Sequence, residues 1–237
     1  MRTLLAFLFL LIGMYAKGQS LDTNNTSLSE QAGNADSLKF TGPSETSPLY
    51  NGRIFYWYPA KEGHAFFLSP EWHTGSVLYD DVWYHDIKLK YDIYKDEVIV
   101  LHPGFKSIRL FSERVQQFTM GQHSFVRLSP GKNSSMKKGF YQQLAQGTIT
   151  VLALHQKRLK ENISDNKLIQ YFDPANFYYA VKDGVYYPVK KLKTLLDLAK
   201  DQRQNIVRHL KKQGLKYRLN KEKTIAEAAA FYNQSQK

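Results

Sequence analysis

The sequence predicts a mainly β protein: an antiparallel meander, arranged as a sandwich or as an open or closed barrel, with a short C-terminal α-helical segment. Short runs of aromatic and β-branched residues alternate with turn residues from Tyr50 to Val189. The chain also contains 16 tyrosines and 14 phenylalanines, which suit the half-buried surface of a pleated sheet. Because short strands joined by tight turns are typical of antiparallel sheets, about ten to twelve strands are expected in this region.

The strongest turn signal is Asp183-Gly184, which separates two tyrosine-rich runs. Asp-Gly adopts the positive φ angles of a tight hairpin turn at little cost, so a hairpin is expected there. Further turns are expected at Asp80-Asp81, Lys95-Asp96 and Gly147. The strands are expected within residues 53–58, 65–68, 75–101, 106–111, 114–120, 124–128, 139–159 and 176–189.

The chain after residue 189 predicts two or three short amphipathic helices. Apolar residues recur at helical spacing in two stripes, Leu192, Leu195, Leu196 and Ala199, and then Ile206, Val207 and Leu210. Gly214 ends the second helix, and a third is expected after Asn220. Helices of this length are marginal alone in water, so they are expected to dock on another part of the protein.

The first residues have the pattern of a secretory signal peptide. Arg2 precedes a short apolar run, and small residues before Gln19 predict cleavage between Gly18 and Gln19. We therefore expect a signal peptide at 1–18 and an exported protein. Its expected location is the periplasm or the exterior of the cell, with attachment to the surface of the outer membrane as a further possibility. An uncleaved anchor is the alternative. The mature chain has no second long apolar run, so no transmembrane span is expected in it.

The remaining chain divides by composition into three parts. Residues 19–47 are rich in Ser, Thr, Asn and Gly and predict a disordered linker. The antiparallel β domain is expected at 48–189 and the basic helical segment at 190–237. The net charge of the whole chain is +12, and +9 of it lies in residues 190–237. The chain has no cysteine, which excludes disulfides, thiolate metal sites and cysteine nucleophiles.

The pattern "NGR…YWY…EGHAFFL…W.TGSVLYDDVWYHDIKLKYDIYKDEVIV", followed by a meander, resembles a group of uncharacterised exported Bacteroidota proteins. The tail "VYYPVKKLKTLLDLAKDQRQNIVRHLKKQGLKYRLNKEKTIAEAAAFYN" is similar to theirs, with a Tyr-rich hairpin, a Lys-rich helical segment and a final helix ending in an aromatic pair. The resemblance covers most of 49–233. It implies a cell-envelope location, and it implies no activity, substrate or site residue.

The basic tail is the first candidate binding site. Its cationic side chains could form one positive surface, comprising Lys190, Lys191, Lys193, Arg208, Lys211, Lys212, Lys216 and Arg218. Such a surface attracts an anionic envelope surface, a glycan or another envelope protein. Nucleic acid is not expected as a partner of an exported protein. The competing interpretation is a solvated helix face without a ligand.

The second candidate is the stretch EGHAFFLSPEWHTG at 62–75. Glu71 and His73 would share one face of a strand, and with His64 and His85 they could supply metal ligands. The spacing matches no established zinc motif, and the alternative is that these side chains flank a short strand at 65–68. The sequence contains neither a G-x-S-x-G nucleophile motif nor a phosphate-binding glycine loop, so no cofactor is expected.

Three functions follow from these observations. The first is a non-enzymatic binding or structural-accessory role in the cell envelope, through the basic tail. The second is a carrier that holds a lipid or other apolar ligand inside the aromatic β domain. The third is a hydrolase or metal-dependent enzyme built on the His and Glu side chains of the second candidate. The sequence does not choose an oligomeric state.

Overall fold

The structure is a computed structural model that describes residues 42–59, 61–131, 136–164 and 167–236. The chain divides into two compact units, 1–39 and 40–237, and all described residues belong to the second. The predicted signal peptide, its cleavage site at Gly18 and Gln19, and most of the predicted linker therefore lie outside the described residues.

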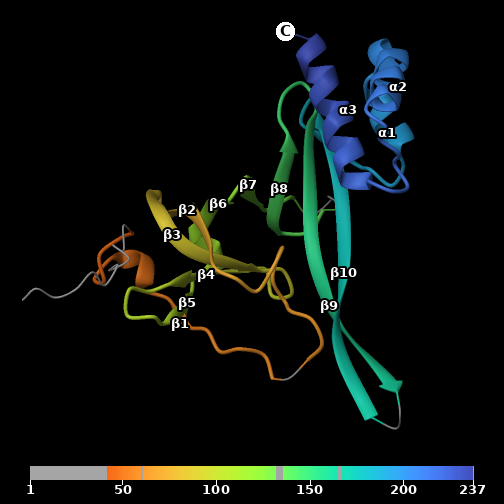
Figure 1. The fold of residues 1–237 in the computed structure, drawn as a ribbon. Helices are drawn as coiled ribbons and strands as arrows, with labels where there is room; N and C mark the ends of the chain where they lie inside the picture. The colour runs from red at the N-terminus through yellow and green to blue at the C-terminus, as the bar shows by residue number, and fades with distance from the viewer. Residues whose placement is uncertain (1–41, 60, 132–135, 165–166, 237) are drawn as a thin grey trace, which may run out of the picture. The chain divides into compact units, whose positions relative to one another are not determined.

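The described strands form one antiparallel sheet that does not close into a barrel (Figure 1). Its order is β1-β5-β4-β3-β2-β6-β7-β8-β9-β10-β11. The strands are β1 (Arg53–Ile54), β2 (His73–Tyr79), β3 (Val82–Asp92), β4 (Glu97–Leu101), β5 (Ser107–Arg109), β6 (Val115–Met120), β7 (His123–Leu128), β8 (Gly139–Ala145), β9 (Thr150–Ser164), β10 (Lys167–Lys182) and β11 (Val185–Pro188). The predicted antiparallel meander is confirmed, and the closed barrel, one of the predicted arrangements, is not formed.

The hairpin turns lie where the turn residues predicted them. Asp80 and Asp81 connect β2 to β3 with φ of 50° and 62°, and Asp183 and Gly184 connect β10 to β11 with φ of 51° and 74°. Two successive positive φ angles give a turn whose twist matches that of the flanking strands. Asp and Gly adopt this conformation more readily than other residues, which is why these turns could be read from the sequence.

Two predicted strands are wrong. The strand expected at 53–58 is reduced to β1, and the strand expected at 65–68 is absent from the described structure, where Phe66 forms only an isolated bridge to Asp92. Ala65, Phe66 and Phe67 are all buried. Consecutive buried side chains contradict the alternation of a half-buried strand, so this segment is a loop whose side chains enter the protein interior.

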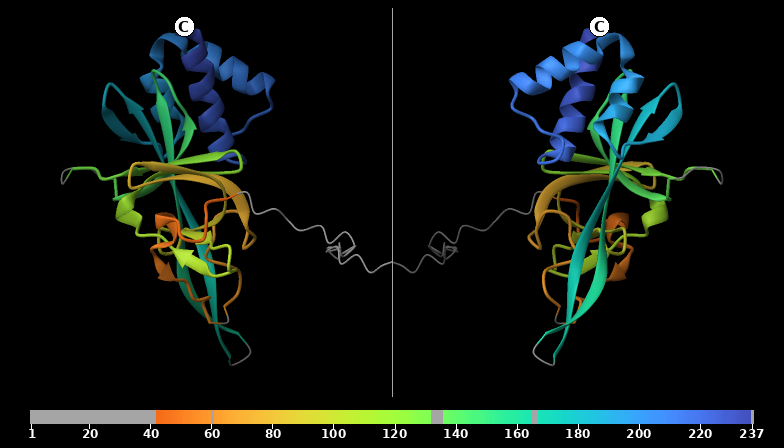
Figure 2. Two further views of the ribbon diagram at one scale, coloured as in Figure 1. Left: turned by 90° about the vertical axis from the view of Figure 1, so that its left-hand side faces the viewer. Right: turned by 90° about the vertical axis from the view of Figure 1, so that its right-hand side faces the viewer.

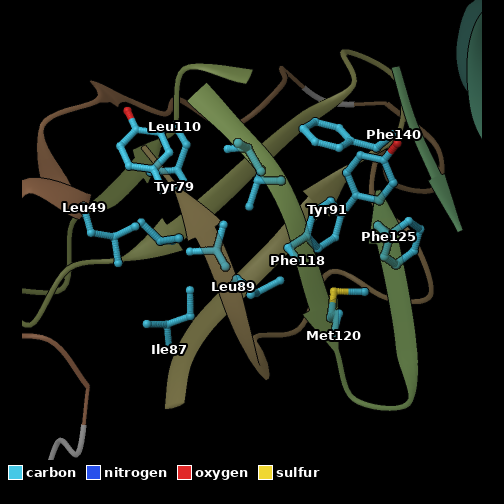
Figure 3. Close-up of a cluster of buried hydrophobic side chains, with 14 of the residues drawn as sticks. Leu49, Tyr79, Ile87, Leu89, Tyr91, Leu110, Phe118, Met120, Phe125 and Phe140 are labelled. Atoms are coloured by element: carbon cyan, nitrogen blue, oxygen red, sulfur yellow. The ribbon is translucent and has the colours of Figure 1, made fainter. Parts of the chain in front are cut away.

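A buried hydrophobic core on the sheet contains a group of aromatic side chains (Figure 3). Phe118 and Phe125 stack with ring centroids 4.6 Å apart, and Tyr91 meets both rings edge-on at 5.1 Å. Phe140 completes the group at 5.2 Å from Phe118. These four rings come from β3, β6, β7 and β8 and join these strands in one core.

β9 and β10 form the longest hairpin of the sheet, and the sequence did not predict its length. The two strands pair without interruption from Ser164 opposite Lys167 to Thr150 opposite Val181. One end of this hairpin packs against the helices, and the other extends as a two-stranded ribbon (Figure 2). Pro174 of β10 lies opposite Lys157 of β9, whose N–H donates away from β10, to the carbonyl oxygen of Ile93. The two residues therefore exchange no hydrogen bonds, so the lack of an N–H in proline removes none from the β9–β10 pairing.

The helices form the second core with β8, β9 and β10. They are α1 (Leu192–Leu198), α2 (Arg203–Lys212) and α3 (Lys221–Ser235), with short 3-10 helices at Pro48–Tyr50, Ser112–Arg114 and Lys200–Gln202. Ile206 and Leu210 of α2 are buried in this core as predicted, whereas Val207 is 47% exposed. Within the residues that the structure describes, no helix has both the length and the apolar character needed to cross a membrane.

Candidate functional site

The histidines of the predicted metal site serve separate local contacts. Nε2 of His73 lies 3.1 Å from Oγ of Ser69, and Nδ1 of His85 lies 3.0 Å from Oγ of Ser76. In the described ranges, no group of three or more His, Cys, Asp or Glu side chains is arranged to hold a metal ion. The structure therefore does not bring His64 and these two histidines together as one ligand set.

His64 instead belongs to the attachment of the 61–68 loop to β9. Nζ of Lys157 donates to the carbonyl oxygens of His64 at 2.6 Å and Phe66 at 3.1 Å. Burial lowers the pKa of His64, and the nearby Lys157 ammonium lowers it further. Both effects favour a neutral imidazole whose role is to hold the loop.

Glu71 lies beside an unusual lysine. Lys90 is only 5% exposed, and its ammonium lies 4.5 Å from the ring of Trp57 and 4.3 Å from that of Trp72. Burial lowers the pKa of Lys90, and the Glu71 carboxylate acts in the opposite direction. Cation–π contacts of this kind stabilise a desolvated ammonium, so Lys90 fastens the 57–72 segment across β3.

One candidate binding site is a groove of about 450 Å³ along the outer edge of β10, which we call the β10 groove. It exists because β11 is much shorter than β10. The N–H of Val189 donates to the carbonyl oxygen of Tyr178 at 2.7 Å, and beyond this bond β10 continues without β11. The groove is lined by Lys137, Leu154, Arg158, Asn176, Phe177, Tyr178, Tyr179, Pro188, Val189, Lys190 and Lys221.

Four of these lining residues are cationic, and they come from four separate segments of the chain. Lys137 precedes β8, Arg158 lies on β9, Lys190 follows β11 and Lys221 begins α3. None of the four forms an ion pair with an acidic residue in the described parts of the chain. Unneutralised cations that converge on a concave surface attract negatively charged ligands.

The predicted basic surface meets this groove only in part. Of its eight residues, Lys190 lines the β10 groove, and Lys191 and Lys193 line a neighbouring depression together with Lys190. Nζ of Lys193 is engaged by Asp197 at 2.5 Å. The other five, Arg208, Lys211, Lys212, Lys216 and Arg218, are exposed on α2 and on the loop that follows it.

A row of polar side chains crosses four adjacent strands and ends in the β10 groove. Nδ1 of His123 on β7 lies 2.8 Å from Nε2 of Gln142 on β8, whose Oε1 lies 2.7 Å from Nε2 of His155 on β9. Nδ1 of His155 lies 3.1 Å from Oδ1 of Asn176, which lines the groove. The ring of Phe67 covers both imidazoles, at centroid distances of 5.1 Å and 4.8 Å.

The helical segment reaches this polar row through Glu222 of α3. Its Oε2 lies 3.9 Å from Nε2 of His155 and accepts a hydrogen bond from the Tyr178 hydroxyl at 3.2 Å. His155 is 5% exposed, and burial lowers its pKa, while the Glu222 carboxylate acts in the opposite direction. Burial also raises the pKa of Tyr178. Both ring nitrogens of His155 face amide oxygens, those of Asn176 and Gln142, and a neutral imidazole has one N–H with which to donate to one of them.

The sequence did not single out Lys137, Arg158, His123 or His155. His155 carried one usable signal, since a histidine in the apolar run VLALHQ lies on a buried strand and needs polar partners. Arg158 gave no such signal, because β9 was predicted to end near it. Its place in the groove depends on how far β10 extends past β11.

Comparison of the chain with protein-family models, with curated proteins and with solved structures finds no match in any of the three.

Proposed function

We propose that this protein is an exported, non-enzymatic binding protein of the bacterial cell envelope, and that it binds a negatively charged ligand in the β10 groove. One observation carries this proposal: four cationic side chains converge on the groove, and none is neutralised by an acidic residue that the structure describes. Cations that form no ion pair retain their attraction for an anion, and the contacts of Lys221 with the rings of Tyr178 and Tyr217 leave its charge unneutralised.

The basic tail supports the same function from outside the groove. Residues 190–237 carry a net charge of +9, and α1 to α3 pack beside the end of β10 that borders the groove. The summed field of these charges draws anions toward this part of the protein and accelerates their association. Export rests on the signal-peptide pattern before Gln19, which supports a ligand of the envelope rather than nucleic acid.

Binding is favoured over catalysis by the state of the polar row. His155 is linked to the groove through Asn176, but its ring is buried and both nitrogens contact neighbouring amides. The Tyr178 hydroxyl is bonded to Glu222. The imidazole of His155 and the hydroxyl of Tyr178 are thus engaged in internal contacts, which position the groove wall rather than exchange a proton with a ligand.

Retention on heparin–agarose tests the proposal with two charge-matched variants. Lys190→Glu/Lys221→Glu reverses two charges in the groove, and Lys211→Glu/Lys212→Glu reverses two on α2, so both lower the net charge equally. We expect the groove variant to elute at a clearly lower salt concentration than the α2 variant. Equal elution of the two variants would show that net charge alone causes retention and would refute the groove as the site.

A further inference from the structure

The β10 groove combines its cations with an apolar floor. Apart from the cations and Asn176, its lining consists of aliphatic and aromatic side chains, with Phe177 37% exposed. In β10 successive side chains face opposite sides of the sheet, so the floor around Phe177 is formed with Tyr179 and Leu154, while Tyr178 lies on the other side and bonds to Glu222. Pro188, which has no N–H to donate, is a further apolar residue of the lining.

This combination discriminates between classes of anion. A sugar requires many directed hydrogen bonds for its hydroxyl groups, and the lining offers few neutral partners, namely Asn176 and the Tyr179 hydroxyl, because the Tyr178 hydroxyl is bonded to Glu222. An inorganic anion would satisfy the cations but leave the aromatic floor exposed to water. A molecule with an anionic head and an apolar chain satisfies both parts of the groove.

We infer that the β10 groove binds a single anionic lipid, with the head group among the four cations and the chain on the floor around Phe177. This inference rests on the proposed function, since it names the ligand class of the same site. A volume of about 450 Å³ is suitable for one small amphiphile, because ligand sites usually measure roughly 300–1,000 Å³. The lipid lies on the outer edge of the sheet, not inside it as a barrel-type carrier would hold it.

A series of monoalkyl phosphates tests the inference, with one head group and an increasing chain. Isothermal titration calorimetry compares inorganic phosphate, butyl phosphate and octyl phosphate below its critical micelle concentration, all with the purified protein. Burial of each methylene in apolar surroundings favours binding, so octyl phosphate should bind at least about tenfold more tightly than phosphate. Equal affinities along the series would overturn the lipid assignment.

Two matched variants test where the alkyl chain of the ligand binds. Phe177→Ser removes the exposed ring from the floor, and Tyr186→Ser removes a ring of similar exposure on β11, 39% against 37%, that does not line the groove. We expect Phe177→Ser to abolish the chain-length dependence while phosphate still binds, and Tyr186→Ser to leave both unchanged. Loss of the dependence in both variants would overturn the assignment, and circular dichroism shows whether each variant is folded.

The outcomes also separate this inference from the proposed function. If phosphate binds in the groove and the alkyl chain adds nothing, anion binding stands and the lipid class is refuted. If Lys190→Gln/Lys221→Gln leaves the affinity for both phosphate and octyl phosphate unchanged, the site itself is refuted. A third arm uses vesicles of zwitterionic phospholipid with one fifth anionic phospholipid; retention on vesicles without any affinity for monomeric octyl phosphate would overturn the single-lipid site.

Discussion

Asn233, near the end of α3, closes the β8–β9 turn through paired hydrogen bonds with the backbone of Ile149. The N–H of Ile149 donates to Oδ1 of Asn233 at 2.9 Å, and Nδ2 of Asn233 donates to the carbonyl oxygen of Ile149, also at 2.9 Å. A third bond runs from Nδ2 to the carbonyl oxygen of Gln146 at 3.1 Å. One side chain of the helical segment thus satisfies a sheet turn more than 80 residues away in the sequence.

Replacing Asn233 should therefore destabilise the whole described unit. Asn233→Ala leaves the buried N–H and carbonyl groups of Ile149 without partners, and each such group costs about 1–3 kcal/mol. We expect the free energy of unfolding in urea to fall by at least about 2 kcal/mol. Gln234→Ala changes the exposed neighbour and should shift it by less than about 0.5 kcal/mol. An Asn233→Ala protein as stable as the wild type would contradict the anchoring role.

The close approach of Gly147 to Asn233 gives a coupled prediction. Gly147 has a φ of +148°, and a Cβ atom there would lie 2.6 Å from Cγ of Asn233. Gly147→Ala should destabilise the protein, whereas Gly131→Ala, where a Cβ would meet open space, should not. Because Asn233→Ala removes Cγ and Nδ2, the two nearest atoms, and leaves only Cβ at 2.9 Å, the double variant should lose less stability than the sum of the two single losses. Strict additivity in a double-mutant cycle of urea unfolding would show that the two residues do not interact.

Phe67 should be essential to the core although it lies in a loop. Its ring contacts those of His155, His123 and Phe125 at centroid distances of 4.8, 5.1 and 5.2 Å. Phe67→Ala opens a cavity among these rings and should cost about 3–5 kcal/mol. Leu68→Ala is the control, because Leu68 is the neighbouring apolar residue of the same loop and is 53% exposed. In thermal unfolding, we expect Phe67→Ala to have a lower melting temperature than Leu68→Ala. Equal melting temperatures would mean that the loop does not pack against the core.

The pKa of His155 predicts how stability depends on pH. Burial lowers this pKa below its ordinary value of about 6.5, so the unfolded chain binds a proton before the folded one does. The neutral His155 contributes its full stabilisation at pH values above the pKa of the unfolded chain. This stabilisation is lost as the pH falls from the pKa of the unfolded chain to the lower pKa of the folded protein. Each unit by which the pKa is lowered amounts to about 1.4 kcal/mol.

This loss can be measured by comparing the free energy of unfolding in urea of the wild type with that of His155→Gln, at about pH 8 and at about pH 5. The stability of the wild type relative to His155→Gln should be lower at the acidic pH, because the variant has no proton to gain at this position. His85→Gln, a substitution of an exposed histidine, serves as the control for the substitution itself. The same wild-type advantage over His155→Gln at both pH values would contradict the burial-driven shift.

The local elements of the fold could be predicted because local interactions decide them. The Asp-Asp and Asp-Gly turns follow from residues that tolerate positive φ, and the meander follows from the strands between those turns. The helices at 192–235 follow from apolar periodicity and from Gly214. The loop at 65–68 could not be recognised, because an apolar run has the same composition in a strand and in a buried loop; only its packing against β9 distinguishes them.

The sequence by itself determined the class of the fold, the position of its turns and helices, and the concentration of positive charge after residue 189. Only the tertiary structure decided which charges act together. Lys137, Arg158, Lys190 and Lys221 meet because β10 extends past the end of β11 and α3 begins beside it, and these are consequences of strand register and helix docking. A site made from four separate segments depends on contacts between residues far apart in the chain, which no local pattern contains.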